Sequence, residues 1–239
     1  MKPVLFVFFL ITASCAFSQS YVDSGIRHFN VGEYDEAMDD FEDAIGIQAM
    51  LTETAKAKIY YYRGLIWLKR AEKSRGNAEQ DPLMQAYDDL TKVLSMDQDM
   101  EAQINDAYRD LSGLLMEEAD DFLKQEKKAD ELPLKLELLD KRIEYLKLIE
   151  ELGVSTLAHL YLGETNKQAG DLIFESTRKV QEMQRAGAYY NEAIRYLELA
   201  RYDDPFNKGV IRTILELARR LDDAERVKEY NRLLDLAGG

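Results

Sequence analysis

Cysteine and histidine are nearly absent from this chain, and their scarcity excludes several kinds of chemistry. The 239 residues include one cysteine, Cys15, and two histidines, His28 and His159. A single cysteine forms no intrachain disulfide, and two histidines far apart in sequence do not have metal-ligand spacing. Phosphate-binding glycine loops and nucleophile elbows are also missing. We therefore expect no enzyme activity, no metal and no cofactor, although a carboxylate site assembled by the fold would leave no such signal.

Proline is scarce, and strand patterns are hard to find. Four prolines and 13 glycines interrupt the chain, so long helices are permitted. Runs of Val, Ile and Thr that alternate with polar residues do not recur. With 46% hydrophobic and 32% charged residues, the composition is that of a globular protein, and the length suits one domain.

Basic residues are fewer than acidic residues in this chain. The formal net charge is −14, with 31 Lys and Arg against 45 Asp and Glu. Nucleic acid is excluded as an expected partner, because phosphate binding requires a basic patch. An anionic membrane is equally disfavoured unless a lipid anchor is present. The charge is interpreted as a source of solubility through self-repulsion, with a basic partner as the alternative.

The first 18 residues differ from the rest. Lys2 is their only charged residue, residues 3–13 form an apolar run, and small residues follow. This order is typical of a secretory signal peptide, and the run is short for a membrane span. Cleavage after Ser18 is favoured, which makes residues 1–18 a signal peptide and residues 19–239 the mature domain, exported to the periplasm or secreted.

Residues 12–15 allow a second interpretation. The sequence Thr-Ala-Ser-Cys resembles a bacterial lipobox, although threonine stands where leucine is usual. In that case Cys15 would be lipidated and the protein would be an outer-membrane lipoprotein.

A pattern of small and apolar residues recurs along the mature chain. Within Tyr21–Ala44, Gly25 precedes a turn at residues 32–34, and a second helical pattern follows. That pattern places a small or apolar residue before apolar residues four and seven positions later, which share one helix face. Its copies are Ala37/Phe41/Ala44, Ala86/Leu90/Val93, Leu139/Ile143/Leu146, Ala193/Leu197/Ala200 and, loosely, Val227/Tyr230/Leu234.

Three glycines precede these second helices at matching positions. They are Gly25, Gly64 and Gly163. Glycine inside a helix costs about 1 kcal/mol relative to alanine, so each needs a reason. We expect close approach of the paired helix, with Ala37, Ala86 and Ala193 opposite.

At these residues the chain resembles the tetratricopeptide repeat family. The resemblance is good for Tyr21–Ala44 and for Gly187–Pro205, and weaker elsewhere. It implies an all-α, right-handed superhelix of stacked antiparallel helix pairs, about five in number, because one pair cannot bury its apolar face alone. It also implies a protein–protein interaction scaffold.

The chain departs from the family in the length of its units. The separation of the paired small residues grows from Gly25–Ala37 to Gly163–Ala193. We expect elongated first helices, with residues 71–80 as a helix end and loop and Asp81-Pro82 as the start of the next helix. Residues 169–185 keep helical spacing.

The resemblance also implies a concave groove lined by first helices, which holds a segment of another protein or a peptide. Carried over by position, the groove residues are Val22, Ile26, Phe29, Tyr61, Leu65, Leu68, Leu160, Glu164 and Lys167. The alternative is that the long later helices cover this face. A terminal-carboxylate clamp is not supported, because Val22 and Ile26 stand where that mode uses Lys and Asn.

Clustered tyrosines raise the possibility of a carbohydrate-binding module. Three consecutive tyrosines cannot share a helix face, so Tyr60 and Trp67 are assigned to the core, Tyr61 to the groove and Tyr62 to an edge. Packing is also favoured for the later tyrosines. These are Tyr189, Tyr190, Tyr196 and Tyr202.

Adjacent carboxylates are interpreted as solvated faces. Neighbours on a helix point about 100° apart, which suits neither a shared proton nor a metal. The segment Asp97–Glu101 resembles the start of a calcium loop but lacks its later glycine and acidic residue, so we reject it.

Overall fold

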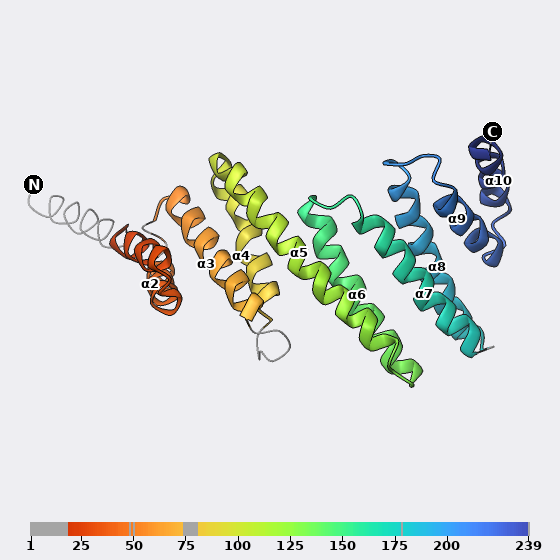
Figure 1. Cartoon of the computed structure of the whole chain (residues 1–239), viewed down its shortest axis with the longest axis horizontal. Helices are drawn as coiled ribbons and strands as arrows, with labels where there is room; N and C mark the ends of the chain where they lie inside the picture. Colours follow the sequence, from red (N-terminus) through yellow and green to blue (C-terminus); the bar gives the residue numbers. More distant parts are fainter. Residues whose placement is uncertain (1–18, 48, 50, 74–80, 178, 239) are drawn as a thin grey trace, which may run out of the picture. The chain divides into compact units, whose positions relative to one another are not determined.

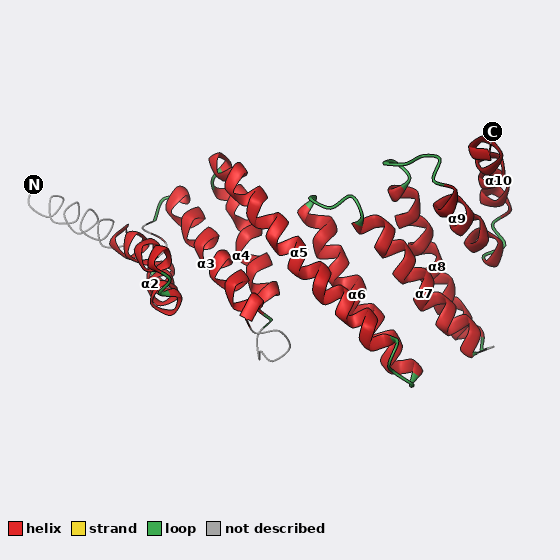
Figure 2. Ribbon diagram, viewed as in Figure 1, coloured by secondary structure: helices red, strands yellow, loops and turns green. Residues whose placement is uncertain are grey.

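The computed structural model describes residues 19–47, 49, 51–73, 81–177 and 179–238. Within these residues the regular secondary structure is helical, and no strand occurs (Figure 2). The predicted all-α class is therefore confirmed. The predicted signal peptide, with Cys15, lies outside the described residues.

Consecutive helices pack as pairs (Figure 1). In chain order the helices are residues 19–31, α2 (Tyr34–Gly46), α3 (Glu53–Lys73), α4 (Pro82–Met96), α5 (Glu101–Glu126), α6 (Leu132–Leu152), α7 (Ala158–Ser176), α8 (Val180–Ala200), α9 (Lys208–Arg220) and α10 (Ala224–Gly238), with the 3₁₀ helix η2 (Gln98–Met100) before α5. The described part of the chain thus provides five antiparallel pairs, as the repeat pattern predicts.

The pairs belong to two compact units. Unit 1 ends at Leu114 and unit 2 runs from Leu115 to Gly239, so α5 contributes its first half to one unit and its second half to the other.

The core of unit 1 forms where residues 19–31 meet α2 and α3. Its buried members are Val22, Ala37, Met38, Phe41, Ala44, Leu51, Ala55, Ile59 and Ile66. Around them lie the half-buried Tyr21, Ile26, Phe29, Tyr34, Ile45, Tyr62 and Trp67. A Cβ added to Gly25 would lie 2.5 Å from Cε1 of Phe41, and one added to Gly64 would lie 2.6 Å from Leu90. The predicted close approach is confirmed. The contacting side chain, however, is four positions beyond the predicted alanine.

Unit 2 repeats this packing. A Cβ on Gly163 would lie 2.6 Å from Cγ of Leu197 and 3.3 Å from the carbonyl oxygen of Ala193, so here the predicted alanine does contribute. About two turns further along α7, a Cβ added to Gly170 would lie 2.5 Å from Cε1 of Tyr190, a contact that the sequence pattern did not indicate.

The predicted elongation of the first helices is confirmed for α3, α5 and α7, which have 21, 26 and 19 residues, and is wrong for α9, which has 13. The second helices α6 and α8, with 21 residues each, are also long, against 13 in α2. The predicted start of α4 is also confirmed, because the Asp81 side chain accepts a hydrogen bond from the backbone N–H of Leu83 at 2.9 Å and Pro82 opens the helix.

The prediction of continuous helical spacing through residues 169–185 is wrong. Helix α7 ends at Ser176, and α8 begins at Val180. Thr177 is extended, and its hydroxyl accepts a hydrogen bond from the backbone N–H of Lys179 at 3.2 Å. A threonine that satisfies a nearby backbone donor favours a turn over a continued helix.

Candidate functional site

Four of the predicted groove residues serve packing in unit 1. Val22 is 0% exposed and Leu68 is 4% exposed, so neither presents a side chain to a partner. Their assignment to a groove is corrected, because both side chains are buried, Val22 as part of the unit 1 core. Ile26 and Phe29 are half-buried and pack against the core of unit 1.

Tyr61 and Leu65 are the remaining predicted residues of unit 1, one turn apart on α3, and both are half-buried. Burial raises the pKa of the Tyr61 phenol, and Tyr62, Asp106 and Asp110 raise it further. The electrostatic effect shows that the phenol lies near two exposed carboxylates of α5. We name this combination of Tyr61, Leu65, Asp106 and Asp110 the α3–α5 face.

Two of the aromatic assignments need correction. Tyr62, predicted at an edge, packs between Phe29 and Phe41, with ring centroids 5.0 Å and 6.2 Å away. Tyr60, predicted in the core, is half-buried, and the ammonium of Lys92 lies 4.9 Å from its ring centroid.

The predicted groove residues of unit 2 follow α7. Leu160 packs against the unit 2 core, and Glu164 is exposed. Lys167 forms an ion pair with Asp171 at 2.7 Å and approaches Glu216 of α9 at 3.9 Å. This face is therefore polar, as predicted, but its lysine is already engaged by carboxylates of the same unit.

A polar network joins α7, α8 and α9. The hydroxyl of Tyr190 donates to Asp171 at 2.9 Å, and the guanidinium of Arg220 bonds both the carboxylate and, at 2.8 Å, the same hydroxyl. Burial raises the pKa of Tyr190 to about 12. Because these groups satisfy one another, the network holds helices together rather than offering free ligands.

Three buried charged residues were not singled out from the sequence. Glu126, at the end of α5, is 4% exposed and accepts a hydrogen bond from the Gln168 side chain of α7 at 2.9 Å. Asp89 of α4 is 3% exposed and lies 3.2 Å from Nε of Arg63 on α3. Arg142 of α6 is 5% exposed and approaches Asp120 of α5 at 3.6 Å. Burial raises the pKa of Asp89 and lowers that of Arg142. Each joins neighbouring helices within its own unit.

The two histidines have separate acidic partners. Nδ1 of His28 lies 2.9 Å from Asp40, and Nε2 of His159 lies 3.1 Å from Glu150. Among the residues with described positions, no group of three His, Cys, Asp or Glu side chains could hold a metal ion. In the segment that resembles a calcium loop, Asp97 accepts from the backbone N–H of Asp99 and caps η2.

Three of the four later tyrosines pack rather than form a platform. Tyr190 and Tyr196 are 2% exposed, and the Tyr189 hydroxyl donates to Asp140 at 2.6 Å. Tyr202 alone is open to solvent, at 83% exposure. These positions do not provide the row of exposed rings on which a sugar would stack.

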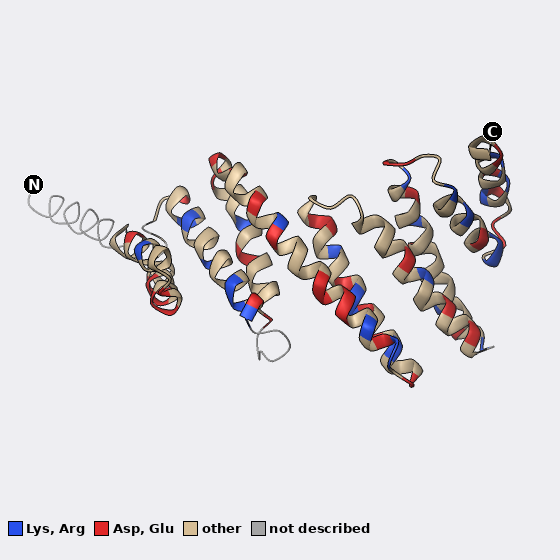
Figure 3. Cartoon of the chain, viewed as in Figure 1, with Lys and Arg blue, Asp and Glu red and all other residues tan. Residues whose placement is uncertain are grey.

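Charges of both signs are interspersed on most helices, as Figure 3 shows. Helix α2 carries acidic residues without any Lys or Arg. None of the described helices combines the length and the apolarity that a bilayer crossing demands.

Comparison with known proteins gives no family. No family model matches the chain, and no curated protein matches it. Among solved structures, the crystal structure of MamA protein is 13% identical over 92% of this chain and 91% of that one, with a TM-score of 0.29. A de novo designed helical repeat protein is 17% identical over 95% and 94%, with a TM-score of 0.27. At such scores the description of the fold rests on this chain's own helices.

Proposed function

We propose that this protein is a non-catalytic scaffold, a divergent member of the tetratricopeptide repeat family that binds a segment of another protein on the α3–α5 face. The observation that supports this proposal is the position of Tyr61, half-buried one turn from Leu65 and close to Asp106 and Asp110. Stacked helix pairs offer such faces preformed, without the cost of ordering them on binding.

The chemistry of this face suggests its partner. Tyr61 and Leu65 supply apolar area for one or two anchoring side chains. Asp106 already pairs with Arg109 of the same helix at 2.8 Å, so Asp110 is the carboxylate that favours a positive charge beside them. We expect an extended or helical segment in which an apolar residue stands next to Lys or Arg. The net charge of −14 would speed the approach of such a basic segment.

Export is part of the proposal. The first 18 residues would direct the chain out of a bacterial cytoplasm, to the periplasm or beyond. Mass spectrometry of the mature N-terminus separates the two forms considered: a chain that starts at Gln19 is soluble, and one that starts at an acylated Cys15 is an outer-membrane lipoprotein.

The binding proposal is tested by site-specific photo-crosslinking in the native cell. A photoreactive amino acid placed at position 65 should give a discrete crosslinked protein. The same residue at position 236, where Leu236 of α10 is 60% exposed, serves as the matched control. In a second experiment, the photoreactive amino acid replaces Asp106. Addition of Tyr61→Ala to that variant should weaken the crosslink relative to the same variant with Tyr61 intact.

A crosslinked band that is the same at positions 65 and 236, or that persists unchanged with Tyr61→Ala, would overturn the assignment of the α3–α5 face. Circular dichroism of each variant must match that of the parent chain, so that loss of the band reports on binding and not on unfolding.

A further inference from the structure

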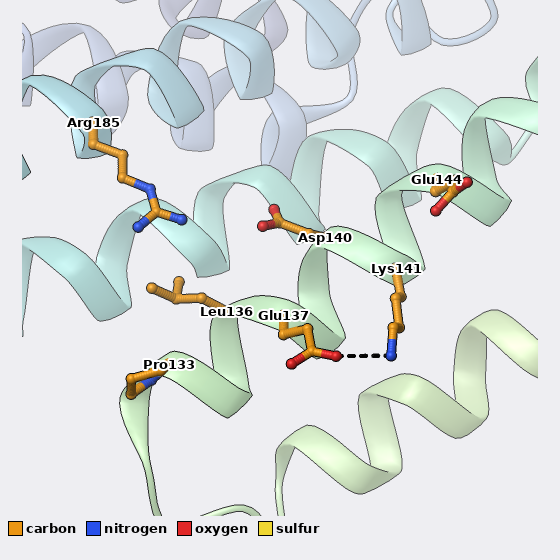
Figure 4. A pocket seen from close by; sticks show the side chains of 7 residues that line it. All are labelled: Pro133, Leu136, Glu137, Asp140, Lys141, Glu144 and Arg185. Atoms are coloured by element: carbon orange, nitrogen blue, oxygen red, sulfur yellow. Dashed lines mark hydrogen bonds and ion pairs between the residues drawn. The ribbon is translucent and has the colours of Figure 1, made fainter.

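A hollow with charged walls lies in unit 2, between α6 and the first turns of α8 (Figure 4). Its volume is about 430 Å³, which suits one or two side chains rather than a folded element. The residues around it are Pro133, Leu136, Glu137, Asp140, Lys141, Glu144 and Arg185. We call it the α6–α8 pocket.

One wall of the pocket is held in place by a hydrogen bond between helices. The hydroxyl of Tyr189 on α8 donates to Oδ1 of Asp140 on α6 at 2.6 Å. The guanidinium of Arg185 lies 5.9 Å from the centroid of the Tyr189 ring. Asp140 and Arg185 therefore face the same space from different helices, with Tyr189 fixing the distance between those helices.

The charges of the pocket are only partly compensated. Glu137 forms an ion pair with Lys141 at 2.8 Å. Across the residues for which positions are described, Glu144 has no ion pair or hydrogen bond, and Arg185 has no ion pair, although its side chain shares a hydrogen bond with that of Tyr189. Figure 4 shows Arg185 at one end of the hollow and Glu144 at the other, with Asp140 between them.

This arrangement selects among ligand types. A purely anionic group would meet Asp140 and Glu144, and a purely cationic group would meet Arg185. A ligand with both signs of charge avoids either repulsion, provided that its positive group lies toward the carboxylates and its negative group toward the guanidinium. The exposed Pro133 offers apolar contact to the aliphatic part of such side chains, and the buried Leu136 lies beside it.

We propose that the α6–α8 pocket binds a segment of a partner protein that presents one basic and one acidic side chain. The basic side chain pairs with Glu144 and Asp140, and the acidic one pairs with Arg185. This site does not depend on the α3–α5 face, which belongs to the other unit, so either proposal can fail while the other stands.

The experiment is an NMR titration of the ¹⁵N-labelled mature chain with short blocked peptides. The probe is acetyl-Asp-Ala-Arg-amide, and two isosteres, acetyl-Asn-Ala-Arg-amide and acetyl-Asp-Ala-citrulline-amide, each lack one charge. The expected result is saturable shifts of the backbone amides around Asp140, Glu144 and Arg185 with the probe. Each isostere should bind about two- to fivefold more weakly, the usual effect of one partly exposed ion pair.

Matched variants decide whether these residues are responsible. Glu144→Gln should remove the advantage of the probe over the citrulline peptide, and Arg185→Gln should remove its advantage over the asparagine peptide. Glu175→Gln and Arg212→Gln change exposed charges elsewhere in unit 2 and should leave both preferences intact. Absence of saturable shifts at the pocket, or equal binding of all three peptides, would overturn the proposal.

Discussion

The ring of Phe41 fills the space that a side chain on Gly25 would occupy, with Cε1 2.5 Å from the position of an added Cβ. The same relationship joins Gly64 to Leu90 and Gly163 to Leu197. Glycine in a helix interior destabilises the helix by about 1 kcal/mol relative to alanine. Here the absence of a side chain allows the paired helix to pack closely. In each pair, a large side chain of the second helix inserts against the bare backbone of the first.

Replacement of Gly163 by alanine should therefore destabilise the protein. The added methyl group would overlap Leu197 at 2.6 Å and meet the Ala193 carbonyl oxygen at 3.3 Å, and backbone yields less easily than a side chain. We expect the free energy of unfolding to fall by about 1–3 kcal/mol, the usual cost of overpacking. Urea denaturation followed by circular dichroism measures it.

Gly113 offers the matched control. It lies within α5, and an added Cβ would have no neighbour within 4 Å among the described residues. Gly113→Ala should stabilise the protein by up to about 1 kcal/mol, because alanine favours the helix. If Gly163→Ala were as harmless as Gly113→Ala, the packing explanation for the repeated glycines would be wrong.

These glycines show what the sequence could and could not predict. A glycine inside a helical pattern is costly, and its recurrence before a fixed apolar pattern indicates close helix contact. The identity of the contacting side chain is a different matter, because two residues four apart share one helix face. Spacing alone could not distinguish Ala37 from Phe41, and only the packed structure shows which of them reaches Gly25.

The network around Tyr190 should make stability depend on alkaline pH. Burial raises the pKa of Tyr190 to about 12 from an ordinary value of 10.0. In the unfolded chain the phenol ionises first, so between these values the unfolded state binds fewer protons than the folded state and stability falls as pH rises. Below about pH 10 the phenol is protonated in both states, so its contribution to stability is fully present and does not change with pH.

Tyr190→Phe tests this dependence. At neutral pH the variant should lose about 1–3 kcal/mol, because the hydrogen bonds of the hydroxyl with the charged side chains of Asp171 and Arg220 are both removed. Between about pH 10 and pH 12 its stability should fall less steeply than that of the parent chain. Tyr202→Phe, at an exposed position, should leave the pH profile unchanged. Urea midpoints measured across this range give the comparison, and parallel profiles for Tyr190→Phe and the parent would contradict it.

The same network marks the limit of prediction for candidate sites. Asp171 and Arg220 are separated by 49 positions, and no local pattern relates them. The turn at Thr177, after which α8 runs back along α7, was itself predicted as helix. The contact between Asp171 and Arg220 could therefore not be predicted from the sequence. Likewise, the groove positions were carried over from the family by their place in the repeat, which does not predict side-chain exposure, and Val22 and Leu68 are buried.

The buried pair of Arg63 and Asp89 leads to the last prediction. Their atoms lie 3.2 Å apart, yet Nε and Oδ2 are both without a hydrogen-bond partner of good geometry among the described residues. Lys92 lies 3.6 Å from the other carboxylate oxygen. Removing the Asp89 carboxylate from water costs free energy, and the attraction to poorly aligned Arg63 offsets only part of that cost. The pKa of Asp89 is therefore raised by burial.

Asp89→Leu alone should cost about 3–5 kcal/mol, because it leaves the guanidinium of Arg63 without its partner in a largely buried position. The double variant Arg63→Met with Asp89→Leu should recover most of that loss, since apolar side chains of similar size fill the same space without the desolvation penalty. A double-mutant cycle by urea denaturation measures the coupling. If the two substitutions were simply additive, the pair would not be coupled, and the contact between α3 and α4 would depend on the neighbouring apolar side chains alone.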